Sequence, residues 1–363
     1  MESKKRLDGI TFARAFCAIG IIIFHFFCHS HSKIKFFFII KNCSWGDILV
    51  TVFFAISGAV LYYNYENITN LNKYYYKRWK TIYIPFYICY CIFFIEKLIL
   101  SKKLFWGGNP IRILLSFLGI DGYLSYRLST YYLVGEWFLG AIILIYLLYP
   151  IICFIMKKNQ LIIPIVLIIG YIIQYLTNFF KISNFWNLIT CLGSFYFGIL
   201  CIRNRTIILE KFFSGLTAII LFLIVLILDF NISLKAQILG MLLFIFLVVS
   251  GNYLLKISLI NAIITFISGI SFYIFLIQHQ IILNIFHFYN PGNFIVVLPL
   301  LCAIIILTII LSKVIQFITV KFILTSLLIF VMVHKTKKRS CLICTLYQQT
   351  KVYLTKKIFT KVL

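Results

Sequence analysis

The sequence predicts an all-α protein, a polytopic transmembrane helical bundle of about ten spans with a cytoplasmic N-terminus. Of its 363 residues, 63% are hydrophobic and only 12% are charged, which is more apolar surface than a soluble domain could bury. Apolar runs of about 18 or more residues recur along the chain, and each is long enough to cross roughly 30 Å of hydrocarbon. Backbone polar groups find no water in lipid, so such runs must be helices.

The first span follows a short basic start, MESKKRLDG, and no small-residue cleavage site ends it, so we expect a retained helix and not a signal peptide. The ten expected spans are, in order, 9–29, 46–66, 82–100, 136–156, 161–178, 185–202, 212–230, 234–253, 260–286 and 295–318. A further apolar stretch, 322–333, is short for a span and should either extend the tenth helix or lie at the membrane interface. The longest connection, 101–135, holds Pro110 and several glycines and should be partly structured.

The distribution of charge predicts the orientation of the chain in the membrane and the partner of its C-terminal tail. The net charge is +25, and an inside N-terminus places most loop lysines and arginines in the cytoplasm, as the positive-inside rule requires. All nine acidic residues precede Phe230, whereas eight lysines and arginines follow His334. We therefore expect one integral membrane domain, 1–334, and a basic cytoplasmic tail, 335–363. Anionic lipid headgroups are the expected partner of this tail, and nucleic acid is not.

The eleven cysteines are scattered, mostly within spans, where cysteine behaves as a small hydrophobe. Cys341 and Cys344 form a lone CxxC pair in the basic tail. Without a second ligand pair, this spacing is weak evidence for zinc, and we expect no metal site.

The first span carries two ionisable residues, Arg14 and His25, inside the apolar stretch RAFCAIGIIIFH. Eleven residues turn an α-helix about 20° past three full turns, so both side chains share one face with Ala18 and Ile21, about 16 Å apart along the axis. Snorkelling of Arg14 to the headgroups and an interhelical hydrogen bond of His25 would each account for one residue alone. Their shared face favours a common purpose.

Further polar residues lie at matching depths of other spans. Arg78 and Lys80 precede the third span in KYYYKRWKTIYIPF, at the level of Arg14, and form either a phosphate-binding cation cluster or a membrane anchor. On the outer side, Glu136 begins the fourth span, where it is either solvated or bonded to an acceptor.

His279 lies in the outer half of the ninth span, between Gln278 and Gln280. Such groups are costly in lipid and should face the bundle interior. We expect the remaining span-end histidines, His29 among them, to be solvated. FFAISG in the second span favours close helix packing over a substrate contact.

Together, these motifs resemble the acyltransferase-3 family of integral membrane O-acyltransferases, which mostly acetylate cell-surface carbohydrates of bacteria. The resemblance covers about residues 5–320. It is carried by Arg14 with His25 after ten intervening residues, by FFAISG after Gly46-Asp47, by KRWKTIYIPF, by EWFL with Tyr146 and Pro150 following, and by ISFYIFLIQH. The second arginine of the family's paired-arginine motif is replaced by Thr81, and Lys80 could substitute for it as a point charge. A late Glu-Pro pair of some members is absent.

The resemblance implies acyl-CoA as co-substrate, a saccharide acceptor and a place in the bacterial cytoplasmic membrane. It also implies that His25 is the catalytic histidine and that Arg14, with Arg78 and Lys80, contacts the CoA phosphates. The pantetheine arm would run past Ala18 and Ile21, and His25 would take the proton of the acceptor hydroxyl. Glu136 or His279 would orient the base or the acceptor. A covalent acyl-histidine stays open.

Two other functions fit the residues. Buried arginine and histidine also mark transport pathways, so the chain could be a transporter or flippase of a lipid-linked glycan, although it shows neither repeated halves nor many buried charges. It could also be a non-catalytic subunit of a glycan-assembly complex whose charges only set its topology.

Overall fold

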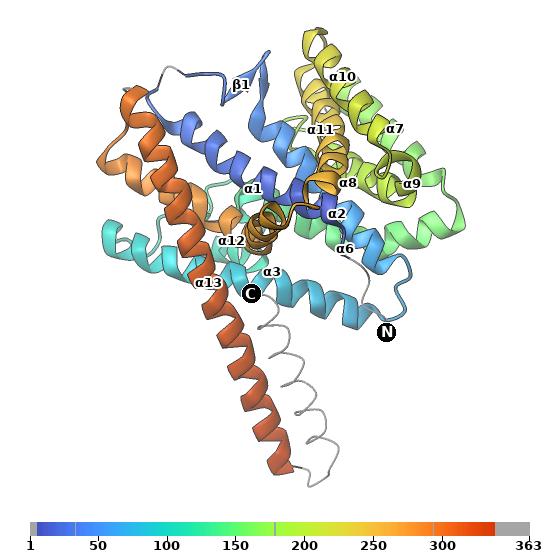
Figure 1. Cartoon of the computed structure of the whole chain (residues 1–363). Coiled ribbons are helices and arrows are strands. Elements are labelled where there is room, and N and C mark those ends of the chain that lie inside the picture. Colours follow the sequence, from blue (N-terminus) through green and yellow to red (C-terminus); the bar gives the residue numbers. More distant parts are fainter. Residues whose placement is uncertain (1–5, 33, 178, 293, 338–363) are drawn as a thin grey trace. The chain divides into compact units, whose positions relative to one another are not determined.

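The computed structural model describes residues 6–337 except 33, 178 and 293 (Figure 1). It is 78% helical, with a single two-stranded hairpin, β1 (Ile39–Ile40) and β2 (Cys43–Ser44), among the described residues. The helices are α1 (Asp8–His29), α2 (Trp45–Tyr65), α3 (Leu71–Ser101), α4 (Ile113–Leu118), α5 (Asp121–Leu124), α6 (Glu136–Lys158), α7 (Ile162–Leu176), α8 (Leu188–Arg203), α9 (Arg205–Ile208), α10 (Phe212–Ile227), α11 (Ile232–Leu254), α12 (Ser258–Phe288) and α13 (Phe294–Lys337). A 3-10 turn, Pro110–Arg112, precedes α4.

The prediction of a polytopic helical bundle is confirmed, and the chain is a multi-pass membrane protein. Each of the ten predicted spans falls on one helix. Seven helices of the described chain are long and apolar enough to cross a bilayer, while α7, α8 and α10 are shorter apolar helices. How many of the ten helices cross, and on which side the N-terminus lies, stay predictions.

Helix α3 is longer than the third predicted span. The span is predicted to begin at residue 82, and α3 begins at Leu71, so the aromatic and basic run before the span is helical. Asn70 caps this extension by accepting a hydrogen bond from the backbone N–H of Lys73. The hydroxyl of the buried Tyr74 then donates to the carbonyl of Tyr146 on α6. This contact with a distant helix holds a segment that hydropathy alone assigns to a loop.

The connection from residue 101 to 135 is partly structured, as predicted. It contains the 3-10 turn, α4 and α5, and it is tied to α3 by the hydroxyls of Tyr83 and Tyr87, which donate to the carbonyls of Leu118 and Phe117. Inside it, Ser116 donates to the buried carboxylate of Asp121 at 2.7 Å. The segment is therefore a fixed part of the wall beside the first residue of α6.

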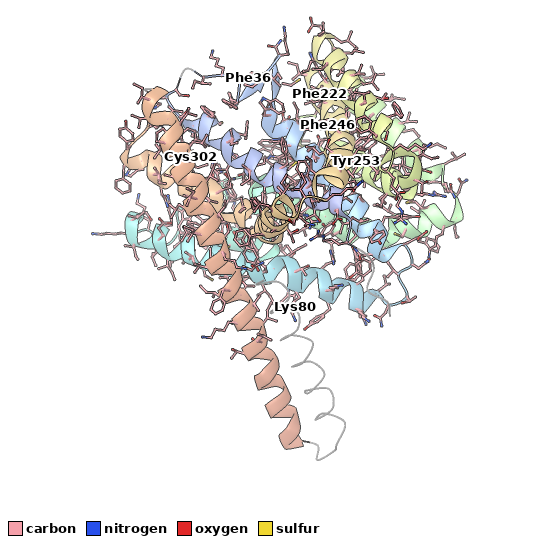
Figure 2. The ribbon with its side chains drawn as sticks, viewed as in Figure 1. Phe36, Lys80, Phe222, Phe246, Tyr253 and Cys302 are labelled. Atoms are coloured by element: carbon pink, nitrogen blue, oxygen red, sulfur yellow. The ribbon has the colours of Figure 1, made fainter. Side chains whose placement is uncertain are left out.

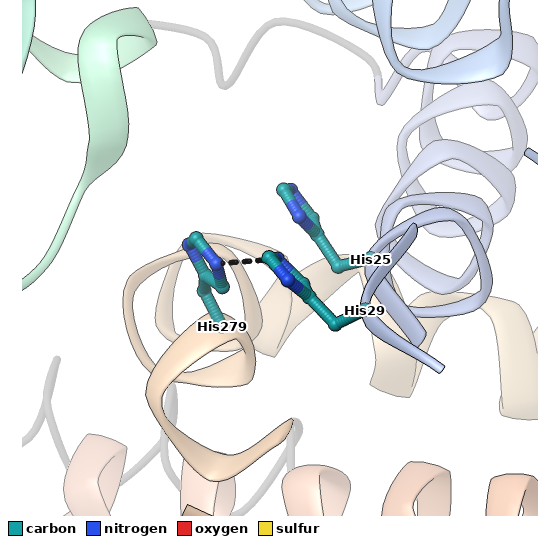
Figure 3. Close-up of side chains that lie close together, drawn as sticks. All are labelled: His25, His29 and His279. Atoms are coloured by element: carbon teal, nitrogen blue, oxygen red, sulfur yellow. Dashed lines mark hydrogen bonds between the residues drawn. The ribbon is translucent and has the colours of Figure 1, made fainter. Parts of the chain in front are cut away.

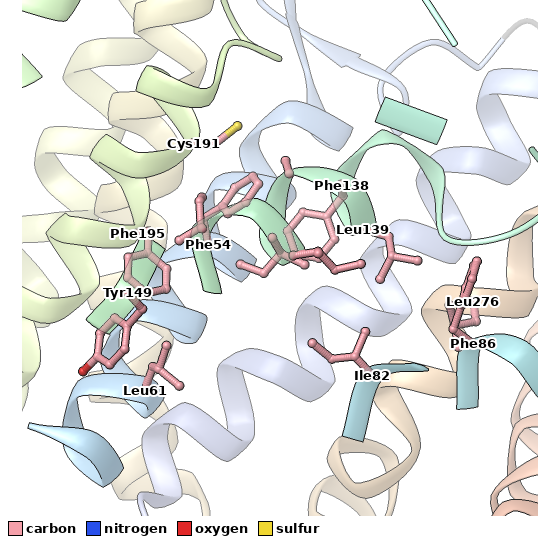
Figure 4. Packing of buried hydrophobic residues seen from close by; sticks show 14 of the residues in the cluster. Phe54, Leu61, Ile82, Phe86, Phe138, Leu139, Tyr149, Cys191, Phe195 and Leu276 are labelled. Atoms are coloured by element: carbon pink, nitrogen blue, oxygen red, sulfur yellow. The ribbon is translucent and has the colours of Figure 1, made fainter. Parts of the chain in front are cut away.

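The packing role predicted for FFAISG is confirmed by the approach of α2 to α8. A Cβ placed on Gly58 would lie 1.9 Å from the carbonyl oxygen of Phe195, and one on Gly198 would lie 1.9 Å from that of Ala55. Only glycine allows the two backbones to come this close, as small residues do at helix contacts in membranes. Phe54 and Phe195 pack in the cluster beside this contact (Figure 4).

Helix α1 lies between two of the three apolar clusters of the bundle. Its residues Ile10, Ala13 and Cys17 pack with α2 and α11, while Ala18 and Ile22 pack in the cluster of α12 and the start of α13. A third cluster joins α3, α6, α8 and α12. Because α1 is enclosed on several sides, the buried His25 faces protein and not lipid.

The chain divides into two compact units, 1–315 and 316–363. Large apolar side chains cover the outer faces of helices in the first unit, as expected of lipid-facing surfaces (Figure 2). In the second unit, α13 continues without a break to Lys337, so the stretch 322–333 extends the tenth helix. The tail from 338 onward, with Cys341 and Cys344, lies outside the described residues. The expected boundary between domain and tail at 334/335 is untested.

Candidate active site

Three of the predicted site residues converge at one end of the bundle. His25 from α1, Glu136 from the start of α6 and His279 from α12 meet around a single carboxylate oxygen. The Nε2 of His25 lies 3.1 Å from Oε1 of Glu136, and Nδ1 of His279 lies 3.3 Å from the same oxygen. The two imidazole rings are stacked with centroids 4.6 Å apart. Side-chain exposure is only 10% for His25 and 17% for Glu136, so this polar group is largely closed to water.

The backbone before α6 aims Glu136 at the two histidines. Gly135 has φ +89° and Glu136 itself has φ 45°, so two consecutive residues take the left-handed conformation at the helix start. Such a φ is strained for a residue with a side chain and is retained where the surroundings enforce it. Gly122 of α5 makes room for it, because a Cβ there would lie 2.6 Å from the carbonyl oxygen of Glu136.

His29 joins the same group, contrary to the expectation that it is solvated. Its Nε2 lies 2.9 Å from Nε2 of His279, and Figure 3 shows the rings of His25, His29 and His279 side by side. One ligand nitrogen from each of the three lies within 4.8 Å of the others. The sequence does carry the signal, since His29 is four residues, about one helical turn, beyond His25.

The predicted inward orientation of the two glutamines beside His279 is correct. The fully buried Gln278 donates its Nε2 to Oε1 of Glu136 at 3.2 Å, so that oxygen is surrounded by three polar neighbours. Gln280 donates its Nε2 to the carbonyl oxygen of Leu133, just before α6, at 2.6 Å. These bonds fix α12 against the start of α6 and hold the histidine between them.

A cavity of about 300 Å³ opens beside this group. Its lining includes His25, His29 and Glu136, together with Asp47 of α2, Trp137 of α6 and Trp186, which precedes α8. Trp137 and Trp186 are stacked, with ring centroids 5.4 Å apart and planes at 18°. The carboxylate of Asp47 has no hydrogen bond or ion pair with any residue that the structure describes. The cavity thus combines aromatic faces with an unused acceptor group.

Arg14 and Arg78 gather at the opposite end of the same helices. Arg14 lies close enough to Tyr146 of α6 to interact with it electrostatically, and the guanidinium of Arg78 lies 5.9 Å from the Tyr146 ring centroid and 5.3 Å from that of Tyr65. Arg14 to His25 covers about 16 Å along α1, and Tyr146 to Glu136 about 15 Å along the antiparallel α6. The two separations are nearly equal, so Arg14 pairs with Tyr146 at one level of the bundle and His25 pairs with Glu136 at the other.

These cations have no acidic partner. Within the described residues, neither arginine side chain makes an ion pair, and Nε of Arg78 is buried without a hydrogen-bond partner. Lys80, which Figure 2 labels on α3, is partly buried and makes no ion pair within the described chain. The structure thus brings Arg14 and Arg78 to one tyrosine and places Lys80 two residues further along α3.

The path expected for the pantetheine arm, past Ala18 and Ile21, is only partly open among the described residues. Along α1 the cavity reaches Ile21 but not Arg14, and Ala18 is buried in the apolar cluster of α12. Phe53, Phe138 and Phe275 line the cavity, and the Phe138 ring lies 6.0 Å from Phe53 and 5.2 Å from Phe275. Phe275 is one turn from His279, toward the end of the bundle that holds Tyr146. These three rings form a phenylalanine layer on the inner side of the cavity.

Comparison with known proteins gives one match. A family model described as an acyltransferase domain matches residues 7–315. No curated protein and no solved structure matches the chain. The matched segment contains all the site residues described above, from Arg14 to His279.

Proposed function

Because the chain belongs to the acyltransferase-3 family of membrane acyltransferases, we propose that it is an O-acyltransferase of the bacterial cytoplasmic membrane. It would move an acyl group, which we take to be acetyl, from cytosolic acyl-CoA to a hydroxyl of a cell-surface or lipid-linked saccharide. His25 is the general base. The single observation that carries this proposal is the contact of the buried His25 with Glu136 inside a cavity.

The contact of His25 with Glu136 supports Nδ1 as its reactive nitrogen. When Nε2 carries the proton and donates to Glu136, Nδ1 keeps a lone pair, and Nδ1 has no partner among the described residues. A carboxylate that holds the tautomer and stabilises the charged ring is the arrangement that makes histidine an effective base. Nδ1 is closed to water in this conformation, so the hydroxyl reaches it only after neighbouring side chains move.

The transfer balances without another reactant. The acceptor oxygen attacks the thioester carbonyl carbon, and its proton passes to Nδ1 of His25. The carbon–sulfur bond then breaks, and the proton passes from the imidazole to the leaving thiolate, so that CoA leaves as a thiol. Direct transfer is the simplest sequence of steps, and a covalent acyl-histidine would use the same nitrogen.

The cavity supports a saccharide as the acceptor. Sugars present apolar C–H faces and rings of hydroxyls, and Trp137 with Trp186 offers flat apolar faces, while Asp47 offers an unused hydrogen-bond acceptor. Hydroxyl groups of a sugar can donate hydrogen bonds to this side chain.

The cations at the other end support acyl-CoA as the donor. Arg14 and Arg78 lack acidic partners and are partly buried, which leaves their guanidinium groups free for phosphate oxygens. The distance of about 16 Å to His25 suits a donor with phosphates at one end and a thioester at the end of a long arm. Because the cavity does not reach Arg14 in this conformation, the arm must displace the rings of the phenylalanine layer as it enters.

The test compares surface glycans of cells with the gene, without it, and with His25→Ala in its place. We expect mass spectrometry to show glycans lacking one acyl group in the last two strains, with glycan export unchanged. Loss of the glycan itself from the surface would favour the transporter. Normal acylation by a well-expressed His25→Ala protein would refute the assignment of the base.

A further inference from the structure

We propose that His25, His29 and His279 form a zinc site whose occupation blocks the acyl-transfer reaction. Metal binding is argued from the geometry alone, whereas the blocking effect rests on the proposed role of His25. The site is distinct from the lone CxxC pair of the tail, and the sequence pattern does not predict it.

The three histidines have the composition and positions of a metal site. Neutral imidazole nitrogen is a preferred ligand of Zn²⁺, and His25 and His29 are one turn apart on α1, so both rings leave the helix on the same side. His279 faces them from α12, and one nitrogen from each ring lies within 4.8 Å of the other two. Two rigid helices thus supply three ligands to one point.

The distance between His29 and His279 is close to that in a tetrahedral zinc site, and the ligand nitrogen of His25 lies within 4.8 Å of both. With Zn–N bonds of about 2.0–2.1 Å, ligand atoms lie about 3.3–3.4 Å from one another. The two Nε2 atoms of His29 and His279 are 2.9 Å apart, so they need to separate by only a few tenths of an ångström. Oε1 of Glu136 is 3.3 Å from Nδ1 of His279, the ring nitrogen that does not face His29, so this carboxylate is the partner that orients the ligating His279 ring.

Binding of zinc would remove the base. When one ring nitrogen of His25 ligates the metal, the other nitrogen of the neutral imidazole carries the proton, so neither can accept a proton from the acceptor hydroxyl. His29 and His279 are partly exposed, and His29 lines the cavity, so an ion reaches the site by the same opening as the acceptor. Zinc outside the membrane would then switch the enzyme off.

The experiment uses the full chain purified in detergent, with Cys341→Ser and Cys344→Ser introduced so that the tail cannot bind zinc. Calorimetry with ZnCl₂ and visible absorption with CoCl₂ are recorded for this protein and for His29→Ala and His31→Ala versions of it. His31 is the matched control, because it lies two residues from His29 but outside the three-ring group. The thermal unfolding midpoint of each protein without metal shows whether it is folded.

We expect one zinc per chain, a tetrahedral cobalt spectrum, and affinity at least tenfold weaker in His29→Ala but unchanged in His31→Ala. Zinc should inhibit acyl transfer, a chelator should restore it, and His29→Ala should need at least tenfold more zinc for half-inhibition of its own zinc-free rate. Equal affinity in both variants, or no binding by the parent protein, would overturn the site. Zinc binding without inhibition would overturn only the blocking effect. A parent protein that binds zinc but transfers no acyl group would count against the proposed function and not against the zinc site.

Discussion

The two ends of the α1–α6 pair differ in whether their ionisable groups have a partner of opposite charge. At the His25 end, one carboxylate oxygen of Glu136 lies within 3.1–3.3 Å of two imidazole nitrogens and an amide nitrogen. At the Arg14 end, the guanidinium groups of Arg14 and Arg78 make no ion pair within the described chain, and Tyr146 lies near both. The histidines at the first end therefore already have an acidic partner, whereas the cations at the second end do not.

This difference suits the first end to a preorganised reaction and the second end to ligand binding. Buried groups whose partners are already in place need little rearrangement when a reaction begins, which suits groups that move protons. Cations left without a partner gain most when an anion arrives, which suits a site for phosphates. Changes at the first end should therefore alter kcat, and changes at the second should alter the KM for acyl-CoA.

The largest expected effect is that of His25→Ala. Loss of the base should lower kcat about 10²–10⁴-fold, because general base catalysis contributes about that much. The rate of CoA release in membranes measures it, and His31→Ala, at a neighbouring histidine outside the group, should retain the parent rate. A kcat within a factor of two of the parent protein would place the base elsewhere.

Glu136→Gln comes next. The amide keeps the size of the side chain but removes its charge, and it can donate to His25 and stabilise the wrong tautomer, so kcat should fall about 10²-fold with little change in the KM for acyl-CoA. Glu66→Gln, at a carboxylate bonded to Tyr62 away from the cavity, is the control. If both variants had the same kcat, Glu136 would have no part in holding the base.

Arg14→Ala should weaken binding of the acyl donor. Hydrogen bonds to charged groups are worth about 1.5–3 kcal/mol, so the KM for acetyl-CoA should rise about 10–100-fold. Acetyl-pantetheine, which has the arm but no phosphates, should show no such rise. Arg127→Ala, in the loop before α6, should change neither value. A rise in KM that is equal for both donors would assign Arg14 to the arm or to folding and not to phosphate.

Lys80→Ala should have the smallest effect. The side chain is partly exposed and acts as a point charge screened by solvent, so the KM for acetyl-CoA should rise no more than about threefold, and the rise should disappear at high salt. Kinetics at two ionic strengths test this. An effect as large as that of Arg14→Ala, or one that salt does not reduce, would place Lys80 inside the phosphate site.

The fold could be predicted largely from hydropathy, because long apolar runs have only one stable conformation in lipid. The missed helical extension before residue 82 depends on Asn70 as a cap and on the bond from Tyr74 to α6. The first is a local signal that hydropathy does not read. The second joins residues 72 positions apart and cannot be seen in the sequence.

The candidate site was predicted in its residues but not in its contacts. Ionisable side chains inside apolar runs identify Arg14, His25 and His279, because their cost in lipid must be offset by a function or a partner. No pattern shows that Glu136 contacts both histidines, or that Arg14 and Arg78 share Tyr146, since these pairs form only when four helices pack. His29 lies one helical turn from His25, but its position near the end of the span predicts a solvated side chain.

The phenylalanine layer also bears on ion permeability. On the proposed function, the two substrates reach the protein from opposite faces of the bilayer, and an open passage between those faces would dissipate the proton gradient. Phe138 packs between Phe53 and Phe275 on the inner side of the cavity. We expect these rings, in this position, to keep such a passage closed while no donor is bound.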